Sequence, residues 1–293
     1  MQNDLTLSDE AMQKEGHFKI LLVNDDGFVT RALPLTYEIL NGFGEVLAVV
    51  PETPKSGGGH SLTLHKPLFL RELGIYGLRV FAINGTPVDA FHAAKDILGF
   101  NPDLVVSGIN IGENTSSQNI LYSGTVEAAI EAGLFGYPSI ALSADVLTDE
   151  EFENPKYSFM IRKVVEALIE YIKDNGWFDG VDTLSVNLPR TPTPKGVVMP
   201  KTQRIRFIQR FERRIDPRGR EYYWLVGERV VEEGSDSYYL SNGYVTVTPL
   251  VADLTHPAIS GCKELTEKIN DLLRHMERAL GNIKSGLGCS RIA

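Results

Sequence analysis

The stretch "ILLVNDDGF", residues 20–28, decides the fold of this chain. Its four apolar residues run directly into Asn24, the adjacent aspartates Asp25 and Asp26, and Gly27. A short, continuous apolar run that ends at polar residues is typical of a strand buried on both faces of a parallel sheet. Two neighbouring carboxylates repel each other, so their presence at a strand end calls for a turn, a bound cation or a catalytic role.

Three further apolar runs have the same character, at residues 46–50, 104–106 and 137–144. They alternate with segments of helical spacing, such as residues 33–43 and 126–134. Strands that alternate with helices over short connections indicate a doubly wound α/β fold with a mostly parallel sheet.

The later part of the chain changes character. Residues 204–233 alternate bulky and charged side chains around Asp216-Pro217-Arg218-Gly219, a turn signal that predicts a long antiparallel hairpin. The hairpin is either a packed subdomain or an arm that reaches another subunit, because large aromatics such as Trp224 are typical of interface cores. We expect an N-terminal extension at residues 1–17, an α/β core at 18–200, an arm with a return strand at 201–262, and a C-terminal helix and tail at 263–293.

Composition limits the class of partner. The 293 residues carry a formal net charge of −9, which disfavours stable nucleic-acid binding because that relies on clustered basic side chains. No apolar run reaches membrane-spanning length, and the polar, acidic start has no signal-peptide pattern. Two cysteines, Cys262 and Cys289, do not make a disulfide framework. We therefore expect a cytoplasmic protein with no membrane association.

Polar side chains follow three of the predicted strands. Asp25 and Asp26 follow the first, Ser56 lies in the glycine-rich loop after the second, and Asn110 and Asn114 follow the third. The carboxyl ends of parallel strands meet at one edge of a sheet, where ligands bind. Carboxylate, hydroxyl and amide oxygens suit Mg²⁺, Mn²⁺ or Ca²⁺ rather than zinc. The alternatives are a helix-capping turn for the aspartates and a mobile loop for Ser56.

A helix start lies nearby in the sequence. Ser123, Gly124 and Thr125 directly precede a clear helical pattern in "YSGTVEAAIEAGLFGYP". Hydroxyls and free backbone N–H groups at a helix N-terminus bind phosphate, although an ordinary helix cap would have the same sequence. Beside an acidic metal-type pair the arrangement favours phosphoryl transfer, in which divalent metal and phosphate recur together.

Other common motifs are missing or weak. The sequence lacks a G-x-G-x-x-G after the first strand and a G-x-x-x-x-G-K-[ST], which disfavours dinucleotide binding and P-loop ATP hydrolysis. The adjacent aspartates lack the spacer of a haloacid-dehalogenase-type phosphatase. His60, His65 and His92 are scattered and read as structural or solvent-facing, with His60 able to approach a substrate.

The motifs together resemble the SurE family of metal-dependent nucleotidases. The resemblance spans residues 18–253 and rests on "LLVNDDG", "VVPETPKSGGGHSLTL", "INGTPVDAFHAA", "PDLVVSGINIGEN", "YSGTVEAAIEAGLFGYPSIALS" and "NGYVTVTPL". It implies a Rossmann-like core with a swapped C-terminal arm in a homodimer or homotetramer. It also implies hydrolysis of nucleoside 5′- or 3′-monophosphates with Mg²⁺ or Mn²⁺. By this resemblance Asp25, Asp26, Ser56 and Asn110 match metal ligands, and Asn114, Ser123, Gly124 and Thr125 match phosphate-contacting positions.

The sequence therefore predicts a metal-assisted phosphomonoesterase acting on nucleoside monophosphates. Asp25 or Asp26 could also act as base or nucleophile. Three alternatives stay open: a non-catalytic nucleotide or metal sensor on the same scaffold, a broad-specificity acid phosphatase or polyphosphatase, and a structural assembly protein built on the aromatic hairpin.

Overall fold

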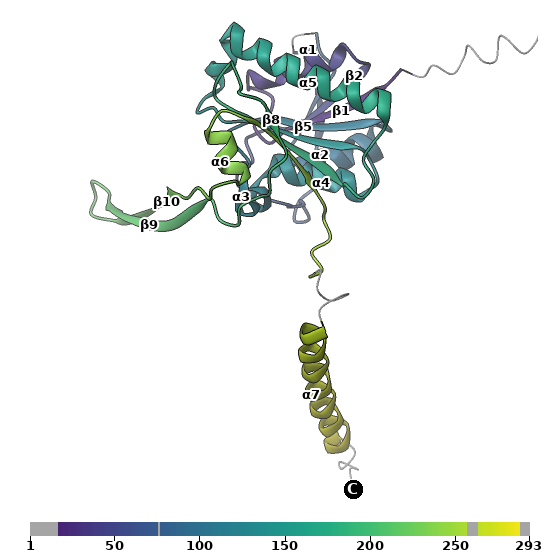
Figure 1. Ribbon diagram of the computed structural model, residues 1–293, viewed down its shortest axis with the longest axis vertical. Helices are drawn as coiled ribbons and strands as arrows, with labels where there is room; N and C mark the ends of the chain where they lie inside the picture. The colour runs from purple at the N-terminus through teal and green to yellow at the C-terminus, as the bar shows by residue number, and fades with distance from the viewer. Residues whose placement is uncertain (1–16, 76, 257–262, 288–293) are drawn as a thin grey trace, which may run out of the picture. The chain divides into compact units, whose positions relative to one another are not determined.

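A computed structural model describes residues 17–75, 77–256 and 263–287 (Figure 1). The chain divides into two compact units, Met1–Val251 and Ala252–Ala293. The expected N-terminal extension lies almost wholly outside the described residues, as do Cys262 and Cys289.

The first unit is built on a nine-stranded sheet of order β3-β4-β2-β1-β5-β6-β7-β11-β8. The six central strands from β4 to β7 are parallel, β3 and β11 pair antiparallel with β4 and β7, and β8 is parallel to β11. This confirms the predicted α/β class. The strands are β1 (Lys19–Val23), β2 (Glu45–Pro51), β3 (Leu70–Leu73), β4 (Val80–Ile83), β5 (Leu104–Ile111), β6 (Ser139–Ala144), β7 (Thr183–Leu188), β8 (Val197–Val198) and β11 (Val245–Leu250).

Helices cover both faces of the sheet (Figure 1). Alternate residues of β1 enter separate cores: Ile20 packs with residues of α1 and α5, and Leu21 packs with residues of α2 and α4. Burial on both faces explains why β1 is continuously apolar. The helices are α1 (Ala32–Asn41), α2 (Pro87–His92), α3 (Ser116–Tyr122), α4 (Gly124–Leu134), α5 (Pro155–Asn175) and α6 (Asp236–Ser241), with a π-helix η1 (Ala93–Ile97) and a 3₁₀ helix η2 (Asp149–Glu153).

Sheet order positions the site. Strands β2, β1 and β5 are adjacent and parallel, with Leu22 beside Ala48 and Val23 beside Ser107. The carboxyl ends of these strands therefore meet at one edge of the sheet, with Asp25, Asp26 and Ser56 in the loops that follow β1 and β2 and Asn110 in the last residues of β5.

Two helices need a separate description. The helix after the "INGTP" turn begins at Pro87, because Thr86 and Asp89 form a reciprocal capping box, and it continues as the π-helix η1. Helix α3, between β5 and α4, has no clear sequence periodicity and is an addition to the predicted elements.

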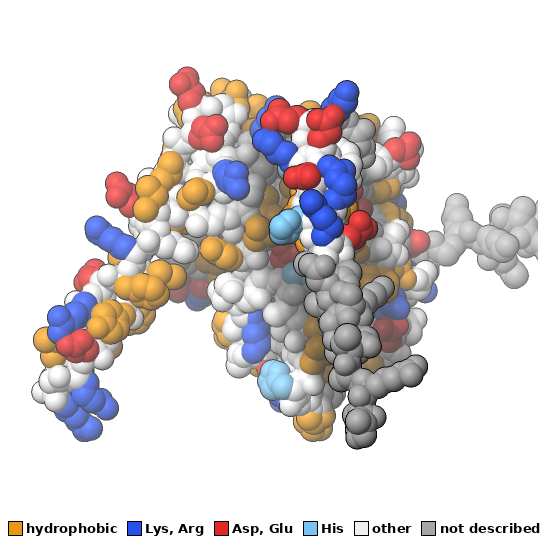
Figure 2. Space-filling view, turned by 90° about the horizontal axis from the view of Figure 1, so that it is seen from below, with side chains coloured by type: hydrophobic (Ala, Val, Ile, Leu, Met, Phe, Trp, Pro, Cys, Tyr) orange, Lys and Arg blue, Asp and Glu red, His pale blue; other side chains and the backbone are white. Residues whose placement is uncertain are grey.

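Strands β9 (Phe207–Ile215) and β10 (Glu221–Arg229) form a separate two-stranded antiparallel sheet, which confirms the predicted hairpin. It projects from the body of the protein, and hydrophobic side chains gather along it (Figures 1 and 2). Phe211 is 71% exposed and Trp224 is 56% exposed. The hairpin is thus an arm and not a packed subdomain.

The second unit contains α7 (Lys263–Leu287), which confirms the predicted terminal helix. Its Ile269, Leu272, Leu273 and Met276 recur at helical spacing and are exposed. Across the parts of the chain that the structure describes, every helix is too short or too polar to cross a membrane.

Candidate metal and phosphate site

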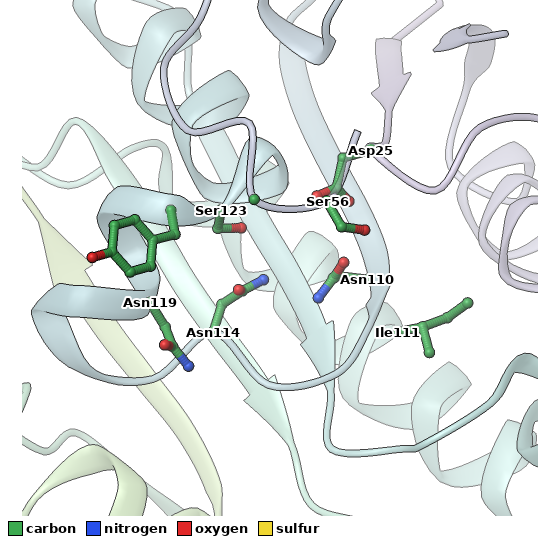
Figure 3. Close-up of a pocket in the computed structure, with 9 residues that line it drawn as sticks. Asp25, Ser56, Asn110, Ile111, Asn114, Asn119 and Ser123 are labelled. Carbon is green, nitrogen blue, oxygen red and sulfur yellow. The ribbon is translucent and has the colours of Figure 1, made fainter. Parts of the chain in front are cut away.

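A cavity of about 190 Å³ opens at the carboxyl ends of β1, β2 and β5 (Figure 3). Five of the sequence-predicted site residues line this site cavity: Asp25, Ser56, Asn110, Asn114 and Ser123. Figure 3 shows the side chains of Asp25 and Ser56 close together, with the amide oxygen of Asn110 pointing toward them. Strand-end loops that are far apart in sequence thus deliver oxygen atoms to one space.

Asp25 is the deepest of these groups, with 3% of the residue exposed. The Thr125 hydroxyl donates a hydrogen bond to Asp25 Oδ1 at 2.5 Å. Burial raises the pKa of the Asp25 carboxyl, and the hydrogen bond from Thr125 opposes that rise. Thr125 therefore orients the carboxylate.

Asp26 lies beside the site cavity rather than among its lining residues. The Ile111 N–H donates to Asp26 Oδ2 at 3.1 Å, which holds this carboxylate against the end of β5. Burial, followed by the charge of Asp25, raises the pKa of Asp26 to about 7. Without a bound cation, the negative charges of the two carboxylates therefore disfavour each other.

A divalent cation fits this donor set. Among the described residues, no cationic side chain contributes to lowering the pKa of Asp25 or Asp26. Buried carboxylates without a counter-charge are costly, and a dication would supply that charge. Ser56 and Asn110 add neutral oxygen donors of the kind that Mg²⁺ and Mn²⁺ prefer. Ser56 and Asn110 are needed to complete the donor set, because the described part of the chain has no group of three or more His, Cys, Asp or Glu that could hold a metal ion.

The start of α4 closes another side of the site cavity. Ser123 is the N-cap of α4, and its Oγ accepts a hydrogen bond from Val126 N at 3.1 Å. The alternative of an ordinary helix cap is therefore correct for this residue. Ser123 also lines the cavity. Gly124 packs directly on Asp25: a Cβ at this position would lie 3.0 Å from Asp25 Cβ and 3.2 Å from Asp25 Oδ2. Only glycine lets the helix N-terminus approach the carboxylate this closely.

Asn114 is fixed by residues of neighbouring strands. Its N–H donates to Asn187 Oδ1 at 2.8 Å, and its Nδ2 donates to Ser143 Oγ at 2.8 Å. Sequence reasoning missed Asn119 and Tyr122, which also line the cavity. Both lie on α3, three positions apart and so on one face of the helix. Recognition of that helix in the sequence would have indicated that they lie together.

The glycine loop, residues 55–61, is fastened to the helices below it. Gly59 N donates to Tyr122 O at 3.0 Å, and His60 lies 2.7 Å from Glu127 and 2.8 Å from Glu131. The hydrogen bonds to these glutamates raise the pKa of His60 to about 9, although burial opposes the rise. His60 therefore holds the loop that contains Ser56. His92 joins the same cluster through Glu131 at 2.7 Å, and His65 is exposed.

The fold and the site cavity define a class: a doubly wound α/β protein whose strand ends gather carboxylate, hydroxyl and amide side chains beside a helix N-terminus. Comparison with known proteins makes this specific, because the family model "Survival protein SurE" matches residues 20–210. The chain belongs to the SurE family, as its motifs predicted.

Relatives match over most of their length. The chain is 44% identical over 234 residues to "5'-nucleotidase SurE" of Thermofilum pendens, covering 79% of this chain and 90% of the relative. It is 42% identical over 243 residues to the protein of the same name from Archaeoglobus fulgidus, covering 81% and 92%. The crystal structure of the SurE protein from Aquifex aeolicus has a TM-score of 0.70 at 35% identity and covers 85% of this chain and 99% of that chain.

Proposed function

We propose that the protein is a divalent-metal-dependent phosphomonoesterase that hydrolyses nucleoside 5′- and 3′-monophosphates to nucleoside and phosphate. The observation that carries the proposal is one cavity in which the buried Asp25, without a protein counter-charge, faces the N-terminus of α4. Relatives that are 36–44% identical and are named 5'-nucleotidase SurE support the same reaction.

Asp25, Asp26, Ser56 and Asn110 are the proposed ligands of Mg²⁺ or Mn²⁺. When bound, the ion supplies positive charge that polarises a phosphoryl group and lowers the pKa of a bound water. Thr125 keeps Asp25 in one orientation through its hydrogen bond to Oδ1. Burial of the carboxylates excludes bulk water and strengthens their interaction with a cation.

The proposed phosphate site consists of Asn114, Ser123, Gly124 and Thr125. The positive end of the helix dipole at the start of α4 attracts the phosphate oxygens. The side-chain amide of Asn114, which Ser143 holds, also binds the phosphate from the wall of the cavity. These fixed donors stabilise the charge that redistributes over the phosphoryl oxygens during transfer.

Phosphate release from a panel of nucleoside monophosphates and simple phosphoesters tests the proposal. A chelator should abolish release, and Mg²⁺ or Mn²⁺ should restore it. Asp25→Asn should keep its fold and lose at least ~100-fold in kcat/KM, as expected for removal of one key electrostatic group. Asp179→Asn, at an exposed position after α5, is the matched control. Full activity in a folded Asp25→Asn protein would refute the assignment, and nucleotide binding without phosphate release would favour the sensor.

We also propose a homodimer or homotetramer assembled through residues 201–262, with 18–200 as the catalytic core. The exposed aromatic and apolar side chains of the arm, including Phe211 and Trp224, support this assembly. Two cysteines in 293 residues support a cytoplasmic location, and a net charge of −9 supports a protein that does not bind nucleic acid.

A further inference from the structure

The base of the arm contacts the loop that contains Asn114. Residues 112–115 connect β5 to α3, and Arg206 lies directly before β9. Arg206 Nε donates to Glu113 Oε1 at 2.7 Å, and the two side chains are only 2% and 4% exposed. A buried ion pair therefore joins the residue next to Asn114 to the root of the projecting hairpin.

Arg206 also forms hydrogen bonds that join the two ends of the arm. Its Nη1 donates to Val230 O at 3.0 Å, and Val230 N donates to Arg206 O at 2.8 Å. The N–H groups of Arg206 and Phe207 both donate to Gln118 Oε1 of α3, at 3.0 Å and 2.8 Å. Both strands of the arm and helix α3 thus converge on one guanidinium-bearing residue.

Glu113, which Arg206 holds in place, also forms hydrogen bonds within the loop. Its Oε2 accepts hydrogen bonds from the N–H of Thr115, at 2.8 Å, and from the Thr115 hydroxyl. The next residue, Ser116, has φ 72°, a left-handed conformation that costs free energy for a non-glycine residue. Asp236 Oδ2 compensates by accepting from Ser116 N at 2.7 Å. The residues on both sides of Asn114 are therefore fixed by buried polar contacts with later segments of the chain.

A buried ion pair is a weak source of stability, because desolvation offsets most of the attraction. Its value here lies in geometry: a guanidinium and a carboxylate pair in a fixed orientation, whereas an apolar replacement would not. Asn114 is held by its hydrogen bonds to Asn187 and Ser143, and the course of the loop that contains it is set by the contacts of Glu113 and Thr115.

We propose that Arg206 is a positioning residue, which acts through Glu113 to set Asn114 in the phosphate site and so connects the arm to catalysis. The proposal rests on the proposed function in that Asn114 binds a phosphate oxygen. Arg206 itself touches neither substrate nor metal.

The test compares Arg206→Met with the double variant Arg206→Met/Glu113→Gln in the full chain. The single variant leaves Glu113 charged, buried and unpaired, so its thermal stability should fall. The double variant removes both charges of the pair, and the glutamine keeps an acceptor for Thr115 N, so its stability should return. Its Kd for inorganic phosphate with saturating Mg²⁺, measured by calorimetry, should nevertheless stay at least 10-fold above the wild-type value.

Kinetics give a second readout. KM for a nucleoside monophosphate should rise with phosphate Kd in the double variant, while the Mg²⁺ concentration for half-maximal activity stays within two-fold of wild type. Arg204→Met, at an exposed position two residues earlier, is the control and should change none of these values. A stable double variant with wild-type phosphate Kd and KM would show that the pair only supports the fold, and would overturn the proposal.

Arg206→Lys covers the case in which the double variant does not fold. Lysine keeps the charge that Glu113 needs but lacks the planar fork that reaches Glu113 and Val230 together. A folded Arg206→Lys protein should bind phosphate at least three-fold more weakly, and unchanged binding would overturn the proposal. If the wild-type chain releases no phosphate, the proposed function fails, while phosphate binding by calorimetry still decides the role of Arg206.

Discussion

His60→Gln removes the charge that fastens the glycine loop. The protonated ring of His60 donates to Glu127 at 2.7 Å and to Glu131 at 2.8 Å, and Glu131 also contacts His92. Glutamine has a similar length and one amide donor group, so it can contact one glutamate as a neutral side chain. The substitution leaves Glu127 and Glu131 close together without the cation between them.

The size of the effect follows from the pKa of His60, which rises from an ordinary 6.5 to about 9. A rise of this size corresponds to about 3 kcal/mol of preferential binding of the proton by the folded protein. The side chain is 33% exposed, so solvent screening reduces its contribution to stability to about 1–2 kcal/mol. Because the pKa is higher in the folded protein, the contribution is fully present below pH 6.5 and is lost as the pH rises through about 9.

Thermal unfolding of wild type and His60→Gln at pH 6, 8 and 10 measures this contribution. At pH 6 the variant should unfold about 2–8 °C lower, and the difference should shrink at pH 8 and vanish at pH 10. His65→Gln, at an exposed position near the loop, is the control and should match wild type throughout. Equal stability of the two proteins at pH 6, or a difference that persists at pH 10, would refute the stabilisation of the glycine loop by protonated His60.

Two other substitutions test the packing of the site and the role of the arm. Gly124→Ala would place a Cβ 3.0 Å from Asp25 Cβ, and about 1–3 kcal/mol of overpacking at the carboxylate should lower kcat/KM about 10–100-fold. Gly74→Ala, where a Cβ would meet nothing within 4 Å, should be neutral in the same phosphate-release assay. Phe211→Ser combined with Trp224→Ser should convert the proposed oligomer to monomer in analytical ultracentrifugation, and an unchanged sedimentation coefficient would contradict assembly through the arm.

Regular elements were predictable where the local pattern and the burial agree. Strands such as β1 and β2 are continuously apolar because both of their faces are covered, and that property is visible in a five-residue window. Helix α3 was missed because its start depends on a contact distant in sequence: Asp236 accepts a hydrogen bond from the backbone of Ser116. No local pattern contains that information.

The candidate site likewise contains residues that the sequence pattern predicts and residues whose role depends on distant contacts. Asp25, Ser56 and Asn110 could be expected together because parallel strand ends meet at one sheet edge, and the site cavity contains all three. Arg206 looked like one charge in an alternating hairpin, and its burial follows from Glu113, 93 positions away. His60 was read as structural or near the substrate, but its two glutamate partners depend on how α4 packs under the glycine loop.

Asn110 lies in β5, but Asp25, Ser56 and Asn114 lie in three irregular loops, and an irregular loop has no backbone ladder to hold its side chains in place. Each loop is instead fastened by a buried or half-buried polar contact to a later segment: Asp25 by Thr125, the glycine loop by His60 with Glu127, and the Asn114 loop by Glu113 with Arg206. Two of the three fastenings end on α4, whose N-terminus is also the proposed phosphate site. A cation and a phosphate are bound productively only when their ligands are already in place, because reorganisation would consume the binding free energy. The distribution of these contacts makes α4 a common support for the proposed metal and phosphate ligands, and our proposal for Arg206 adds the arm to the supports of Asn114.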